Sequence, residues 1–197
     1  MKKLLLPLLI GLVTQYGLYG QESVLQRAYT SHWEVGGLFG NVVYDPNAQS
    51  SPKITERQTK KNLTLQAFNG LNLTSRLATG VTVGFDWYND AMINPVALGA
   101  RYSIVSRYNA RLFATIDAGY GFTWFDKTLN DSRLQGGMMI NPGIGWKLGK
   151  PGNAGFTITV SYKRQEAMLK MPTSDYILKQ EEARQYNRLA VRLGIAL

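Results

Sequence analysis

The feature that most limits the fold of this chain is a two-residue alternation of side chains, clearest between Leu112 and Trp124. Successive side chains of a β-strand point to opposite faces, so the alternation predicts a strand with two different walls. The first wall is apolar and comprises Leu112, Ala114, Ile116, Ala118, Tyr120, Phe122 and Trp124. The second wall holds mainly small or polar groups and comprises Phe113, Thr115, Asp117, Gly119, Gly121 and Thr123.

The small residues of the second wall indicate which face of the sheet meets lipid. A soluble sheet would carry Lys and Glu on that face, whereas this chain carries mostly Gly, Thr, Ser and Asn with isolated charges. Small residues suit the inside of a narrow closed barrel, and an apolar outside suits a membrane. The chain has 197 residues, the size of one domain. We therefore expect a small transmembrane β-barrel.

The alternation can be followed through eight segments, which predicts an all-β fold: an eight-stranded antiparallel up-and-down transmembrane β-barrel. In the first segment, Gly36, Gly37 and Gly40 blur the pattern and indicate a bulge. In the sixth, Pro142 removes one ladder donor. The segments are 33–44, 63–73, 81–87, 96–104, 112–124, 138–146, 156–162 and 189–197.

The first twenty residues have the pattern of a secretory signal peptide. Lys2 and Lys3 precede an apolar stretch from Leu4 to Val13, and a polar, small-residue stretch follows up to Gly20. We expect residues 1–20 to be a signal peptide and residues 21–197 to form the barrel domain. The chain contains no cysteine, so it has neither disulfides nor a lipid-modified cysteine.

The lengths of the connections predict the orientation of the barrel. The segments 45–60 and 166–184 are expected to be long outer loops, with shorter outer links at 89–94 and 126–133. The turns near Ser75, Tyr108 and Lys150 are short. Long loops face outward in such barrels, which places both termini in the periplasm and the barrel in the outer membrane of a Gram-negative bacterium.

Aromatic and charged residues fall on opposite walls of the predicted strands. Four tryptophans share the lipid-facing register and are expected to form an interfacial girdle at two depths: Trp33, Trp87, Trp124 and Trp146. Unpaired charges inside a narrow barrel would be costly, so we expect ion pairs that fill the lumen. Arg192 is expected to pair with Glu34, and Arg101 with Asp117 or Asp86. The whole predicted lumen charge network is Glu34, Asp86, Arg101, Asp117, Lys163, Arg188 and Arg192.

The sequence gives little support for catalysis, and we do not expect an enzyme. The single histidine, His32, follows Ser31, but adjacent strand residues point to opposite faces and cannot form a nucleophile–base pair. Gly149-Lys150 is not a phosphate loop, because Ile144 and Pro151 occupy positions where such a loop requires Gly and Ser or Thr. No cluster of metal ligands is visible, and no cofactor is expected.

Partners are expected at the membrane and at the long loops. The formal charge of +9 favours contact with anionic lipid, but it is not concentrated in a tract that would bind nucleic acid. Segment 45–60 is basic and is a candidate for contact with lipopolysaccharide phosphates. Segment 166–184 is unusually apolar for a loop, and it is expected to extend the barrel strands, to form a cap or to dock a protein. The basic residues in and beside the first loop are Lys53, Arg57, Lys60 and Lys61.

Three stretches resemble the outer-membrane β-barrel (porin-like) proteins of Bacteroidota: 94–102 (NPVALGARY), 111–122 (RLFATIDAGYGF) and 139–147 (MINPGIGWK), with the strand at 156–162 following. The resemblance covers most of the chain after residue 20. It implies an eight-stranded OmpA-like barrel and an outer-membrane location, and it assigns no activity. The C-terminal residue is Leu197, where many such barrels have Phe.

Three functions follow from this reading. The first is a structural or partner-binding barrel whose lumen is largely filled by side chains. The second is a narrow pore for ions or small solutes, with the lumen charges as its lining. The third is a soluble, lipocalin-like carrier with its apolar face inward, which the glycine-rich polar wall disfavours. An enzyme of the envelope is the remotest alternative.

Overall fold

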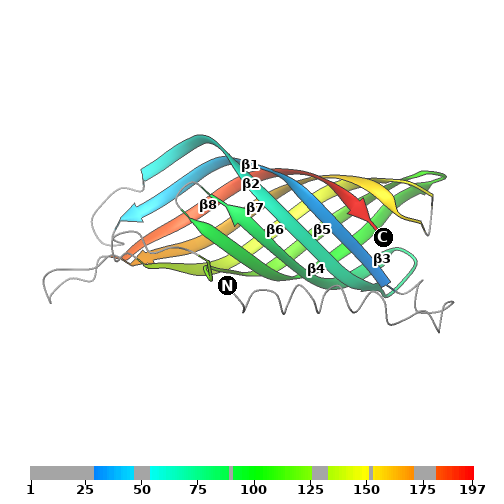
Figure 1. Ribbon diagram of the computed structural model, residues 1–197, viewed down its shortest axis with the longest axis horizontal. Coiled ribbons are helices and arrows are strands. Elements are labelled where there is room, and N and C mark those ends of the chain that lie inside the picture. Colours follow the sequence, from blue (N-terminus) through cyan, green and yellow to red (C-terminus); the bar gives the residue numbers. More distant parts are fainter. Residues whose placement is uncertain (1–28, 47–53, 89–90, 126–132, 151–152, 171–180) are drawn as a thin grey trace, which may run out of the picture.

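A computed structural model describes residues 29–46, 54–88, 91–125, 133–150, 153–170 and 181–197. These residues form a closed antiparallel barrel in which each strand pairs with the next and β8 pairs with β1 (Figure 1). The eight-stranded up-and-down architecture predicted from the sequence is thereby confirmed. The strands are β1 (Tyr29–Pro46), β2 (Ile54–Asn72), β3 (Leu77–Trp87), β4 (Met92–Arg107), β5 (Ala110–Phe122), β6 (Arg133–Leu148), β7 (Gly155–Lys170) and β8 (Glu181–Ala196).

The stagger of the closed sheet follows from the strand registers. Paired residues lead from Gly37 through β2 and β3 to Met92 on β4. In the other direction, through β8, β7, β6 and β5, they lead from Gly37 to Tyr102 on β4. The two end points are ten residues apart (102 against 92), so the strands are strongly inclined. Barrels of this kind tilt their strands by roughly 35–45°.

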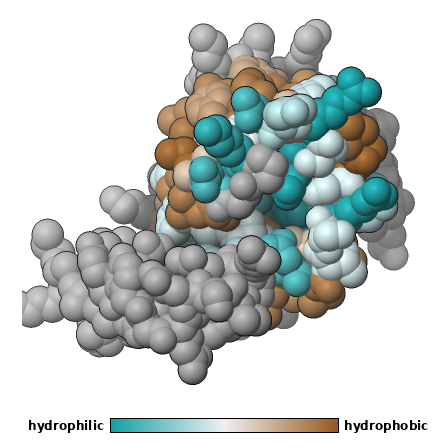
Figure 2. Space-filling view, turned by 90° about the vertical axis from the view of Figure 1, so that its right-hand side faces the viewer, coloured by the Kyte–Doolittle hydropathy of each residue, from teal (hydrophilic) through white to brown (hydrophobic). Residues whose placement is uncertain are grey.

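The outer surface of the barrel is apolar, as the alternation predicted. Large hydrophobic side chains stand exposed on every strand, and Figure 2, which looks at the end of the barrel where the short turns lie, shows polar residues gathered on that end with apolar residues around them. Among the described residues, none belongs to a helix long and apolar enough to cross a membrane. Representative exposed residues are Val35, Leu65, Val83, Leu98, Ile116, Ile144, Val160 and Leu193.

The irregularities predicted in β1 and β6 are present. The β1–β2 register shifts between Leu38 and Gly40, and Gly40 has a φ of 148°, a conformation that other residues rarely adopt. Beside Pro142, the β6–β7 ladder lacks pairs between Ile140 and Gly143, because proline has no N–H to donate.

The predicted boundaries of the long loops are wrong. β2 already begins at Ile54, so most of segment 45–60 belongs to strands β1 and β2. In segment 166–184, β7 continues to Lys170 and β8 begins at Glu181, so the expected extension of the barrel strands into this segment is confirmed although the loop is shorter than predicted. Strand pairing continues there because backbone hydrogen bonds do not require the apolar alternation that only a lipid-facing wall needs. The link predicted at 89–94 is shorter, because β3 ends at Trp87 and β4 begins at Met92, whereas the link predicted at 126–133 is longer, because β5 ends at Phe122 and β6 begins at Arg133.

Several expectations fall on the remaining residues. The predicted signal peptide (1–20) and its cleavage site lie outside the described residues, and so does Lys53. The backbone positions of Arg57, Lys60 and Lys61 belong to β2.

Gly119 tests how tightly the barrel wall is packed. A Cβ at this position would lie 2.2 Å from the backbone oxygen of Val96 and 2.4 Å from Cα of Ala97. We expect Gly119→Val to lower the free energy of unfolding by about 1–3 kcal/mol, because the backbone of β4 must move. Urea titration of the protein in lipid vesicles, followed by tryptophan fluorescence, measures the change. The control is Ala118→Val, whose side chain is exposed on the outer face; an equal loss in both variants would contradict the packing described here.

Candidate functional site

The lumen is the candidate site, because the inward register gathers most of the predicted charged residues there. Three ion pairs lie in it, and each of their six side chains is at most 7% exposed. Arg101 Nη1 lies 2.8 Å from Asp117 Oδ1, and Arg192 Nε lies 3.0 Å from Glu34 Oε2. The Lys163 ammonium pairs with Asp86. Pairing is what makes burial of these charges tolerable, since an isolated charge in such a site is strongly destabilising.

Asp117 is the centre of the largest hydrogen-bonded group. Besides Arg101, its carboxylate accepts hydrogen bonds from Thr82 Oγ1 at 2.6 Å, Asn141 Nδ2 at 3.2 Å and Gln66 Nε2 at 3.3 Å. These donors come from β2, β3, β4 and β6, while Asp117 lies on β5. One carboxylate therefore ties together five neighbouring strands from inside.

The other two carboxylates also receive a hydroxyl each. Thr159 Oγ1 donates to Glu34 at 2.5 Å, and Thr64 Oγ1 donates to Asp86 at 2.7 Å. Glu34 and Arg192 lie on β1 and β8, so their pair crosses the seam between the first and last strands. Lys163 on β7 reaches Asp86 on β3, on the opposite side of the barrel. The sequence register did not indicate this pair, because strand order alone does not give distances across the lumen.

Arg188 belongs to a different environment from the three pairs. Its Nη1 donates to the backbone oxygen of Gly40 at 2.8 Å, and its guanidinium lies over the rings of Tyr88 and Tyr186, 5.5 and 5.9 Å from their centroids. Cation–π contact and a backbone carbonyl together suit a fully buried guanidinium. Arg188 thus lies in the lumen among aromatic rings.

An apolar cluster fills the lumen toward the loop end, and sequence reasoning missed it. The rings of Tyr88 and Tyr186 stack with centroids 4.5 Å apart. Burial raises the pKa of Tyr88 well above its usual value, and the charge of Asp86 raises it further, so this phenol stays neutral. The sequence signal for this cluster is that two apolar residues, Leu38 and Val42, occupy inward positions of β1. The neighbouring glycines obscure the alternation there. The cluster is Leu38, Val42, Tyr88, Ala91, Ile93, Leu134, Ala167, Tyr186 and Ala190.

His32 and Ser31 do not form a catalytic pair in the structure. Ser31 Oγ donates to Asn69 Oδ1 at 2.8 Å, while the His32 ring packs edge-on against Phe68 and Phe113 at centroid distances of 5.7 and 5.6 Å. Within the described ranges, no group of three or more histidine or carboxylate side chains is placed to hold a metal ion.

The four tryptophans are exposed and lie at the two ends of the apolar wall. Trp33 and Trp146 are near the turn end, and Trp87 and Trp124 are near the loop end. At the loop end, neighbouring rings extend the aromatic surface: Phe85 stacks on Trp87 and Phe122 on Trp124, with centroids 5.9 and 4.6 Å apart. The interfacial role of these side chains remains a prediction.

Comparison with known proteins identifies the fold alone. No family model matches the sequence, and no curated protein matches it. The crystal structure of the outer membrane protein OprG from Pseudomonas aeruginosa is similar, with a TM-score of 0.54 and 11% identity over 87% of this chain and 97% of that one. The solid-state NMR structure of the outer membrane protein AlkL in DMPC lipid bilayers is also similar, with a TM-score of 0.51 and 10% identity over 87% of this chain and 89% of that one. The chain therefore has the fold of small outer-membrane β-barrels.

The buried pair of Lys163 and Asp86 gives a direct test of the lumen network. We expect Asp86→Asn to lower the free energy of unfolding by about 3–5 kcal/mol, because the Lys163 charge stays buried without its counter-charge. Urea unfolding in lipid vesicles measures the loss.

Two further variants isolate the cause of that loss. The double variant Asp86→Asn with Lys163→Met removes both charges and should recover much of the stability. Arg164→Gln breaks the pair between Arg164 and Glu166 on the outer surface, where both side chains are about half exposed, and should cost no more than about 1 kcal/mol. Equal losses at the buried and the exposed pair would contradict the role assigned to the network.

Proposed function

We propose that this chain is an integral outer-membrane β-barrel with a closed lumen and a structural or partner-binding role, without enzymatic activity. The observation that carries the proposal is the filling of the lumen by three ion pairs and, toward the loop end, by the apolar cluster around Leu38 and Tyr186. The resemblance to OmpA-like barrels of Bacteroidota is part of the proposal and fits the strand number.

A membrane location is supported by the distribution of side chains. The exposed wall is apolar on every strand, and the lumen holds the charges. Backbone groups in hydrocarbon must be satisfied within the chain, and a closed sheet does this. The same distribution does not fit a soluble, lipocalin-like carrier, which needs its apolar face inside.

The orientation is part of the same proposal. Strands β1, β5 and β7 run toward one end of the barrel, where seven to ten residues connect each of them to the next strand; the shorter turns at 73–76 and 108–109 lie at the other end, with the start of β1 and the end of β8 (Figure 1). Long loops face the outside in bacterial barrels, so we infer that Tyr29 and Leu197 lie on the periplasmic side. Lipopolysaccharide is then the expected lipid partner of the loop end.

Residues 54–62 of β2, called the projecting wall below, extend past β3 at the loop end and support the partner-binding role. The pairing of β2 with β3 ends at Leu63 and Trp87, while β2 continues back to Ile54 beside β1. Among the described residues, positions 54–62 of β2 have no strand on their β3 side. An open backbone edge can accept an extended segment of another protein. A separate groove of about 280 Å³ lies between β1, β6, β7 and β8, and its lining includes Val43, Gly136, Glu166, Met168 and Gln185.

The alternative is a narrow pore. It is favoured by one observation: Thr115, Thr157 and Ser161 are buried in the lumen, and their hydroxyls make no hydrogen bond to another protein group. Buried polar groups of this kind are commonly hydrated, and a hydrated half-lumen would need only a gap in the apolar cluster to conduct.

Single-channel recording in planar bilayers distinguishes the two functions. A closed lumen predicts no steady conductance from the purified protein. Steady current steps would favour the pore, and Asp117→Asn would then shift its selectivity away from cations because the lining loses a negative charge. Val83→Ala on the outer face is the control and should change neither result.

The projecting wall can be removed without opening the barrel. Leu38 and Asn62 are paired across β1 and β2, so an Asn-Gly turn can join them in place of residues 39–61, which removes the open edge of β2. We expect this variant to insert and to keep its three ion pairs in the lumen but to lose the protein partner that wild type retains when isolated from native membranes in mild detergent. Mass spectrometry of both preparations measures the difference; a partner set unchanged by the deletion would contradict a role for this wall.

A further inference from the structure

Two basic side chains stand next to each other at the turn-end mouth of the lumen. Arg111 on β5 is the register partner of Lys147 on β6. Both belong to the inward wall, because Arg111 is two residues from the buried Phe113 and Lys147 is two residues from the buried Gly145. Like charges directly opposite each other destabilise a sheet. The pair therefore needs a counter-charge.

The pair is part of a polar row that crosses four neighbouring strands on the inward wall. Ser106 on β4 is the register partner of Arg111, and Thr157 on β7 is the register partner of Lys147. The Thr157 hydroxyl is buried and has no hydrogen-bond partner among the described residues. The row thus presents two cations between two hydroxyls.

A layer of buried aromatic rings lies directly behind the pair. The Phe113 ring lies over Gly145, since a Cβ on that glycine would be 2.4 Å from Phe113 Cζ. The His32 ring packs edge-on against Phe113 and Phe68, and both phenylalanines are at most 3% exposed. A ligand of the pair therefore approaches from the water at the turn end.

The carboxylates deeper in the lumen do not balance the pair. Along the inward face of β5, Phe113 lies between Arg111 and Asp117, and the Asp117 carboxylate is already paired with Arg101. Neither Arg111 nor Lys147 forms an ion pair with another residue that the structure describes. The counter-charge must therefore come from solution.

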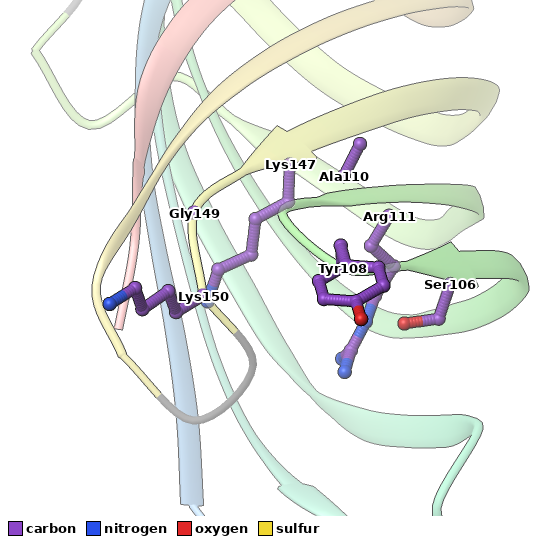
Figure 3. A pocket seen from close by; sticks show the side chains of 7 residues that line it. All are labelled: Ser106, Tyr108, Ala110, Arg111, Lys147, Gly149 and Lys150. Carbon is purple, nitrogen blue, oxygen red and sulfur yellow. The ribbon is translucent and has the colours of Figure 1, made fainter.

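The pair lines a small open hollow between the β4–β5 and β6–β7 turns (Figure 3). Lys150 adds a third cation to its lining, and Ser106 adds a hydroxyl. The two turns are joined, because the backbone N–H of Gly149 donates to the oxygen of Asn109 at 2.8 Å. The cavity volume is about 20 Å³, so the hollow receives one small group, and the rest of any ligand stays in water.

We propose that Ser106, Arg111, Lys147 and Lys150 bind a phosphate group that reaches the lumen mouth from water, either as inorganic phosphate or as a soluble phosphate monoester. A phosphate monoester carries about −1.5 to −2 charges at pH 7, which matches two adjacent cations. Guanidinium and ammonium groups both form charge-assisted hydrogen bonds to phosphate oxygens. The bound group removes the repulsion within the pair and so stabilises the barrel. Only the compartment of the ligand rests on the proposed periplasmic side of the turn end.

Isothermal titration calorimetry of the detergent-solubilised protein with sodium phosphate, glycerol 3-phosphate and sodium acetate tests the site. At about pH 8, where phosphate is mostly a dianion, both phosphate probes should bind wild type at least about 10-fold more tightly than acetate. Tighter binding of glycerol 3-phosphate would identify an esterified phosphate as the ligand, and equal or tighter binding of inorganic phosphate would identify the free ion.

Two double variants locate the binding. Arg111→Gln with Lys147→Gln should weaken phosphate binding at least about 10-fold, because it removes two charge-assisted contacts. The control, Arg76→Gln with Arg107→Gln, removes the same charge from the same end of the barrel but not from the hollow, and should change phosphate binding no more than about 2-fold.

Urea unfolding in lipid vesicles shows whether the variant still folds. Without phosphate, the Arg111→Gln/Lys147→Gln variant should unfold at the same urea concentration as wild type or higher, because it loses a repulsion. Adding phosphate should raise the unfolding midpoint of wild type more than that of this variant.

Three results would overturn the site: no saturable binding of phosphate to wild type, equal affinity for acetate and phosphate, or equal weakening by the two double variants. Each of these leaves the proposed function intact. Recovery of the protein from the soluble periplasmic fraction would instead refute the membrane location and leave the phosphate site intact.

Discussion

The structure depends on closing one sheet, so that backbone hydrogen bonds on all eight strands are made within the chain. Hydrocarbon offers no partner for a peptide N–H or C=O, and the closed part of the barrel satisfies these groups on both sides of every strand, whereas β2 projects beyond β3 at positions 54–62. Closure forces half of the side chains into a narrow lumen. The small residues, the ion pairs and the apolar cluster are all consequences of that confinement.

Charges inside the barrel hold specific strands together. Asp117 receives donors from four other strands, and the pair of Lys163 and Asp86 spans the lumen. Removing a whole pair can be almost neutral, whereas removing one partner is strongly destabilising, so the network is best understood as specifying register. The apolar cluster has a different effect: it fills the lumen toward the loop end with buried side chains.

The sequence was sufficient for the fold class and for the side of the sheet that each residue faces, because a two-residue period fixes register wherever one wall is apolar. It failed at the strand ends, where β2 reaches back to Ile54 without an apolar wall. Within the site, the neighbouring strands of Glu34 and Arg192 made their pair predictable. The contact of Lys163 with Asp86 and the burial of Leu38 depend on the barrel diameter and on the bulge at Gly40, which no local pattern contains.

The pair of Glu34 and Arg192 has a consequence for assembly. Its members are 158 positions apart along the chain, one on the first strand and one on the last. Neither charge has its counter-ion until those two strands meet, so a half-closed sheet would leave a bare carboxylate and a bare guanidinium at its two margins. Intermediates of that kind are unfavourable in lipid, so we expect insertion to be cooperative and the pairing of β1 with β8 to be the step that completes it.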